Sequence, residues 1–73
     1  MNTNEIKSYF LANKNKWVYI NEIINNKSVE IKAFIGSTVD LQIFKVNGLH
    51  AGKLNYQSIT KTVQHITDIL NLD

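Results

Sequence analysis

The stretch SVEIKAFIGSTVDLQIFKVNG, residues 28–48, decides the fold, because its apolar residues recur with a period of two. In a β-strand successive side chains point to opposite faces, so this alternation predicts strands over residues 28–35 and 39–46. The GST turn at 36–38 separates the two strands. The Asn-Gly pair at 47–48 then ends the stretch with a strong hairpin signal, since a type I′ turn needs positive φ at both central residues.

One further strand is predicted on each side of this stretch. WVYINEII, residues 17–24, alternates in the same way and leads into the turn residues NNK at 25–27. After the Asn-Gly turn, LHAGKL at 49–54 would pair back as a short and irregular fourth strand. Because all the connections are short, the strands are expected to form an antiparallel meander.

A helix is predicted at each end of the chain. The first covers about residues 4–12 and begins with Asn2 and Glu5 at capping-box spacing, or with Thr3 as the cap instead. The second covers about residues 57–71, where Asn55 or Ser58 would be the cap. Apolar residues recur along both helices at helical spacing and are expected to face the core. These residues are Ile6, Phe10, Ile59, Val63, Ile66 and Leu70.

Together these elements predict a single α+β domain over residues 1–73. A short N-terminal helix precedes a three- to four-stranded antiparallel sheet, and a C-terminal helix packs on one face of that sheet. No cysteine is present to form a disulfide, so apolar packing must supply the stability of this small domain.

The opposite face of the predicted sheet mixes aromatic and charged side chains. One interpretation is a cross-strand ladder, in which neighbouring aromatic side chains shield one another. The other is a recognition surface, because Trp and Tyr are enriched among the residues that dominate binding energies at interfaces. The residues predicted to bind a partner are Trp17, Tyr19, Lys32, Phe34 and Phe44 on this face, with His50 and Lys53 at its edge.

Composition limits the kinds of partner. All eight cationic side chains are lysines and the formal net charge is +2. Without arginine the chain lacks the planar donor group that reads guanine, so sequence-specific base recognition is disfavoured. No apolar run approaches the roughly 20 residues that span a bilayer. The segment MNTNEIKSYF also lacks the features of a secretory signal, so no membrane association and a cytoplasmic location are expected.

No residue pattern predicts catalysis, a cofactor or a metal site. Gly48 and Gly52 enclose only three residues and Leu54 follows Lys53, whereas a phosphate-binding P-loop has four residues between its glycines and Ser or Thr after the lysine. The two histidines do not have metal-motif spacing, and the carboxylates form no catalytic pair. We therefore expect a protein that is not an enzyme.

Two families resemble parts of this sequence. The helix–three strands–helix order is similar to that of double-stranded-RNA-binding domains, which use a basic cluster at the start of the last helix; here Lys61 stands alone. IKAFIGSTVDLQIFKVNGLHAG, residues 31–52, resembles the strand–strand–turn segment of small phage proteins, among them anti-CRISPR inhibitors. The second resemblance implies a phage or mobile-element protein that inhibits a host defence protein or nucleoprotein complex, such as a CRISPR-Cas effector. A nucleic-acid-binding module and a homodimer that buries the aromatic face are the alternatives.

Overall fold

The structure, a computed structural model, describes residues 1–72, so Asp73 at the end of the predicted domain lies outside the described residues. A helix comes first, five strands of one sheet follow, and a longer helix comes last. The elements are α1 (Thr3–Leu11), β1 (Lys16–Ile24), β2 (Lys27–Ile35), β3 (Val39–Val46), β4 (Leu49–His50), β5 (Asn55–Gln57) and α2 (Ile59–Leu70). The predicted α+β class is confirmed.

The sheet is antiparallel throughout, and its strands follow the order β1-β2-β3-β4, with β5 paired to the other end of β3. Asn25 and Asn26 both have positive φ and join β1 to β2. Asn47 and Gly48 also have positive φ and join β3 to β4, as the Asn-Gly pair predicts. A hydrogen bond connects this second turn to β2: the Asn47 Oδ1 atom accepts from the Ser28 N–H at 3.0 Å.

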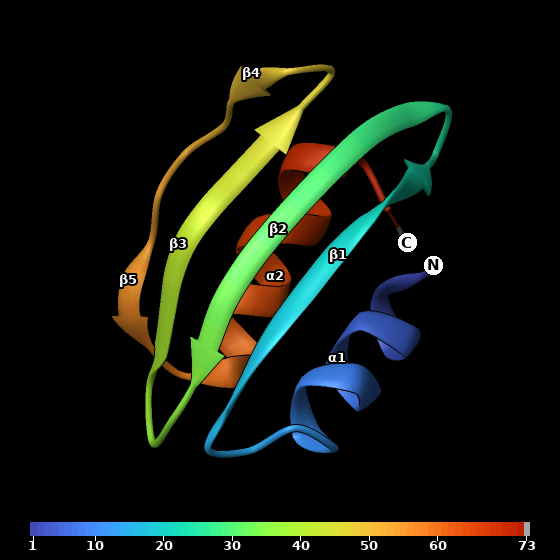
Figure 1. Cartoon of the computed structure of the whole chain (residues 1–73). Helices are drawn as coiled ribbons and strands as arrows, with labels where there is room; N and C mark the ends of the chain where they lie inside the picture. Colours follow the sequence, from blue (N-terminus) through green and yellow to red (C-terminus); the bar gives the residue numbers. More distant parts are fainter. Residues whose placement is uncertain (73) are drawn as a thin grey trace.

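Both helices lie on the same side of the sheet, with α2 behind the strands and α1 beside β1 (Figure 1). Their caps follow the sequence. Asn2 and Glu5 form a capping box with bonds of 2.9 and 3.1 Å, and Ser58 Oγ accepts from the Lys61 N–H at 3.1 Å. Within residues 1–72, the buried side chains between helices and sheet are apolar except for Thr62 and Thr67. The larger side chains of this core include Ile6, Phe10, Ile31, Ile35, Leu41, Phe44, Ile66 and Leu70.

The first hairpin also holds the end of α2. Asn25 Nδ2 donates to the carbonyl of Leu70 at 2.8 Å, and Lys27 Nζ reaches the same oxygen at 3.4 Å. The last carbonyls of a helix have no partner within the helix, so these two donors satisfy one of them. Asn71 ends the helix in the left-handed conformation that favours asparagine. The β1–β2 turn therefore fixes where α2 ends against the sheet.

A β-bulge in β3 changes which side chains face the core. Ala33 pairs with Leu41 but Lys32 pairs with Ile43, so Gln42 is an extra residue in β3. One extra residue reverses the facing of every side chain that follows it. Phe44, predicted on the outer face, is instead only 1% exposed in the core, and Ile43 takes the outer position. The predicted outer-face position of Phe44 is therefore wrong, and its buried ring is not exposed for a partner to contact.

The segment after the Asn-Gly turn differs from the single strand predicted over 49–54. β4 pairs with one end of β3, and the chain then leaves β3 and returns to pair with its other end as β5. Because β5 extends to Gln57, α2 starts at Ile59 rather than at residue 57. At the departure, His65 Nε2 donates to the carbonyl of Gly52 at 2.6 Å. A Cβ at Gly52 would lie 3.2 Å from the His65 ring, so only glycine fits this close approach without displacing the ring.

Candidate binding surface on the open sheet face

Among the elements of the described residues 1–72, none covers the side of the sheet away from the helices (Figure 1). We call it the outer face. On β1 two aromatic side chains stand on it half exposed, Trp17 at 54% and Tyr19 at 52%. The residues of the outer face are Trp17, Tyr19, Asn21 and Ile23 on β1, Ser28, Glu30, Lys32 and Phe34 on β2, and Asp40, Gln42, Ile43 and Lys45 on β3.

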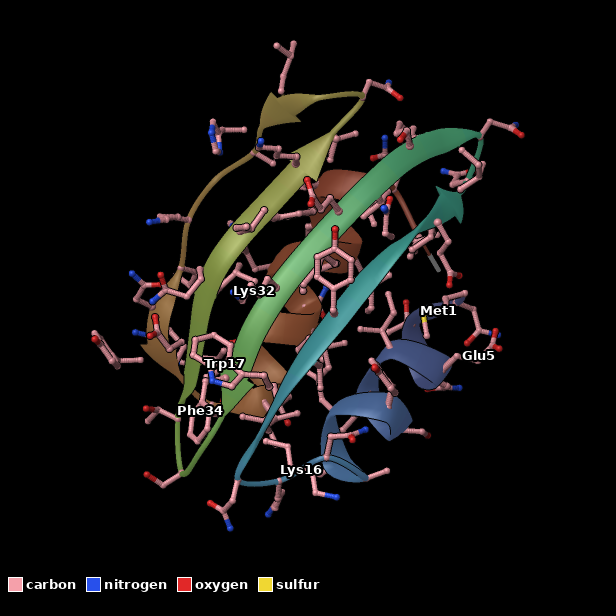
Figure 2. All side chains as sticks on the ribbon, in the orientation of Figure 1. Met1, Glu5, Lys16, Trp17, Lys32 and Phe34 are labelled. Carbon is pink, nitrogen blue, oxygen red and sulfur yellow. The ribbon has the colours of Figure 1, made fainter. Side chains whose placement is uncertain are left out.

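Trp17, Phe34 and Lys32 form one cluster on this face (Figure 2). Trp17 lies directly across from Phe34, and their rings meet edge to face with centroids 5.4 Å apart and an interplanar angle of 69°. The Lys32 ammonium lies 5.2 Å from the centroid of the Trp17 ring, within the range of a cation–π interaction. The cluster therefore holds the indole in place while about half of Trp17 remains in contact with solvent.

A hydrogen bond orients the second exposed aromatic side chain. The Tyr19 hydroxyl donates to Glu30 Oε2 at 2.6 Å, diagonally across the β1–β2 pair. This hydrogen bond, and secondarily the partial desolvation of the hydroxyl, raises the pKa of Tyr19 above its usual value because the phenolate would lose the donor and face the carboxylate. At neutral pH Tyr19 is thus a neutral hydrogen-bond donor whose ring is fixed against β2.

The acidic and basic groups of the outer face are not paired with each other. Glu30 accepts from Tyr19, and Asp40 Oδ2 accepts from Gln42 Nε2 at 2.6 Å. Among residues 1–72 no carboxylate lies within 4.0 Å of the ammonium group of Lys32 or of Lys45. Glu30 and Asp40 therefore accept hydrogen bonds from neutral donors, while the ammonium groups of Lys32 and Lys45 form no ion pair with a carboxylate of residues 1–72.

Four of the seven residues predicted to bind a partner come together. Trp17, Tyr19, Lys32 and Phe34 are neighbours on β1 and β2. His50 is exposed and pairs with Lys45, which places it at the far edge of the outer face. Lys53 is exposed in the segment between β4 and β5, where it joins no strand. Phe44 lies in the core, where its ring meets the His65 ring edge to face with centroids 6.2 Å apart.

Two apolar residues of the outer face were not singled out from the sequence. Ile43 reaches it through the bulge and stands directly across from Lys32. Ile23, at the end of β1, is well exposed. For Ile43, the only indication in the sequence is the adjacent apolar pair Ile43-Phe44, because strict alternation can place only one of two neighbouring residues in the core. His65 on α2 is partly buried by its contacts with Phe44 and Gly52.

Residues 1–72 contain no pocket and no group of three or more His, Cys, Asp or Glu side chains placed to hold a metal ion. Within the same residues neither helix is long and apolar enough to cross a bilayer. In comparisons with known proteins, no family model, curated protein or solved structure gives a significant match to this chain.

Proposed function

We propose that this chain is a non-enzymatic binding protein that docks onto a partner protein or nucleoprotein complex through its outer face. The observation that carries this proposal is the half exposure of Trp17 and Tyr19 on a sheet face that no helix covers. Large aromatic side chains held in fixed positions lose little conformational freedom on binding, which makes them effective contact residues.

The size of the surface suits such a role. The molecule measures 30 × 21 Å along its two longest axes, which is comparable with the roughly 800 Å² that each partner buries in a standard interface. Trp17 lies on the edge strand β1, across from Phe34 near one end of the sheet, and Ile43 lies on β3 across from Lys32. The polar residues Asn21 and Ser28 lie further along β1 and β2. The outer face therefore offers both apolar and polar contact groups, as protein interfaces do.

The resemblance of residues 31–52 to small phage proteins suggests the class of partner. An inhibitor of this kind would act in the host cytoplasm by occupying a surface of a defence protein or nucleoprotein complex, such as a CRISPR-Cas effector. The partner would then cover the outer face, and the core behind it would serve only to keep the face rigid.

The test is capture of partners from a nuclease-treated host lysate by the wild-type chain and by the Tyr19→Ala variant. We expect specific proteins to be captured by the wild type and lost with Tyr19→Ala. The matched control is Leu11→Ala, since Leu11 is also about half exposed but lies on α1. Equal capture by wild type and Tyr19→Ala would contradict the proposal.

Nucleic-acid binding is the second candidate, favoured by the exposed Trp17 and Tyr19 rings beside the Lys32 ammonium. Exposed rings can stack on unpaired bases, and lysine can neutralise phosphate. Glu30 and Asp40 on the same face oppose it, because they repel phosphate. This candidate predicts binding that weakens steeply as the salt concentration rises, because binding releases counterions from the phosphates.

The third alternative is a homodimer in which a second copy of the chain covers the outer face. Light scattering that gives twice the monomer mass would support it.

A further inference from the structure

We infer that Lys32 is the central anchor of the outer face and that the partner presents to it a carboxylate flanked by apolar side chains. The inference rests on the proposed function and names the chemistry of the partner at that same surface. It is based on the position of the Lys32 ammonium group beside the Trp17 ring and on the hydrogen bonds that Glu30 and Asp40 already accept.

Lys32 lies in the middle of the sheet. Tyr19 stands directly across from it on β1, and Ile43 stands directly across on β3. Its ammonium group turns toward the Trp17 ring, 5.2 Å from the ring centroid (Figure 2). The charge therefore lies beside aromatic and apolar side chains, with Glu30 as its acidic neighbour two residues away on β2, and a partner that covers the face would seal it from water.

Covering this charge has a consequence for the partner. An ammonium group that loses its water without gaining an anionic partner is strongly destabilised, and the Trp17 ring alone replaces only part of the lost hydration. No carboxylate of residues 1–72 lies within 4.0 Å of Lys32. The compensating anion must therefore come from the partner, where a charge-assisted hydrogen bond in a dry surround is stronger than one in water.

The carboxylates of the outer face do not compete for this role. Glu30 is held by the Tyr19 hydroxyl and Asp40 by the Gln42 amide. They instead limit what the partner can be, because a densely charged polyanion would meet both of them while it reached Lys32. A single Asp or Glu side chain between apolar residues satisfies Lys32 and the aromatic rings without that repulsion. We therefore assign an acidic and apolar protein segment, rather than a nucleic acid, to this surface.

The test uses random peptides displayed on phage and selected against the wild-type chain, followed by affinity measurements with the selected peptides made synthetically and labelled. The variant is Lys32→Met, which keeps the aliphatic stem and removes the charge. Lys45→Met is the matched control, because Lys45 is also on the outer face but stands directly across from Glu30 on β2, away from the Trp17 ring. Thermal unfolding of both variants checks that the fold is retained.

We expect the selected peptides to be enriched in Asp or Glu next to large apolar residues. Their affinity should fall about tenfold or more with Lys32→Met, and should change little with Lys45→Met. Selection of peptides without acidic residues, failure to select any peptide, or equal binding by Lys32→Met would overturn the inference. Tighter binding of a dT₁₂ oligonucleotide than of any selected peptide would also overturn it, in favour of nucleic acid.

These outcomes are separable from failure of the proposed function. If Trp17→Ala abolishes peptide binding while Lys32→Met leaves it unchanged, the outer face binds partners and only the role assigned to Lys32 is wrong. If peptides bind equally to Trp17→Ala and to the wild type, the outer face is not the binding surface and both proposals fail.

Discussion

At the scale of single residues, neighbouring side chains of one strand have opposite roles. Ile43 and Phe44 are consecutive, yet the first lies on the outer face and the second fills the core. Tyr19 and Val18 divide in the same way on β1. Substitutions of core residues should therefore lower stability, and substitutions of outer-face residues should affect stability much less.

Phe44→Ala should lower the free energy of unfolding by about 3–5 kcal/mol, because it removes a buried ring and leaves a cavity. Trp17→Ala removes a half-exposed ring and one edge-to-face contact, so its cost should be about 1 kcal/mol. Urea unfolding followed by circular dichroism gives both values. Equal destabilisation by the two variants would show that Phe44 is not a core residue or that Trp17 is.

Glu30→Gln should lower the pKa of Tyr19 toward the usual tyrosine value of about 10, because the carboxylate that accepts the hydroxyl proton is removed. The pKa of Tyr19 is raised in the folded chain, so the stability that this hydrogen bond contributes is present below about pH 10 and is lost as pH rises through the raised pKa. A pH titration of the Tyr19 ring resonances by NMR measures the shift. An identical Tyr19 pKa in both proteins would show that the bond to Glu30 is not its cause.

At the scale of elements, the turns and caps follow directly from residue types. Asn25, Asn26, Asn47 and Gly48 all adopt positive φ where the chain reverses, and Ser58 caps α2. These are local requirements, which a short stretch of sequence carries in full. The turn at Gly48 is the clearest place to measure such a requirement in isolation, because nothing lies within 4 Å of the position where its Cβ would be.

Gly48→Ala should destabilise the fold by about 1 kcal/mol, since an L-residue is strained at the positive φ that Gly48 adopts. The melting temperature should fall by about 4–8 °C for each kcal/mol in a domain of this size. Asn47→Gly is the control, because glycine tolerates the same backbone conformation and only the side-chain bond to Ser28 is lost. A Gly48→Ala variant as stable as the wild type would contradict the assigned turn.

The elements that the sequence did not predict depend on contacts between distant residues. The bulge at Gln42 allows both Leu41 and Phe44 to face the core. In the sequence, only the adjacent apolar pair Ile43-Phe44 indicates this bulge. The break between β4 and β5 depends on the contact of Gly52 with His65, thirteen residues along the chain. Strict alternation cannot place either feature, since each is decided by packing against another element.

At the scale of the whole molecule, the fold has two layers and one open side. Both helices cover the inner face of the sheet and bury the apolar side chains there, while the outer face keeps its rings half exposed (Figure 1). Sequence alternation correctly placed Trp17, Tyr19, Lys32 and Phe34 on this outer face. It could not show that Lys32 lies over the Trp17 ring, because that contact depends on side-chain conformation.

Trp17 is the only tryptophan of the chain, so its fluorescence reports on the outer face alone. The most direct measurement of the central claim is quenching of this fluorescence by acrylamide, with and without a saturating amount of the captured partner. Trp17 should be readily quenched in the free chain, because it is 54% exposed, and should become protected when the partner covers the outer face. Unchanged quenching at saturation would show that the partner binds elsewhere and would contradict the outer face as the binding surface.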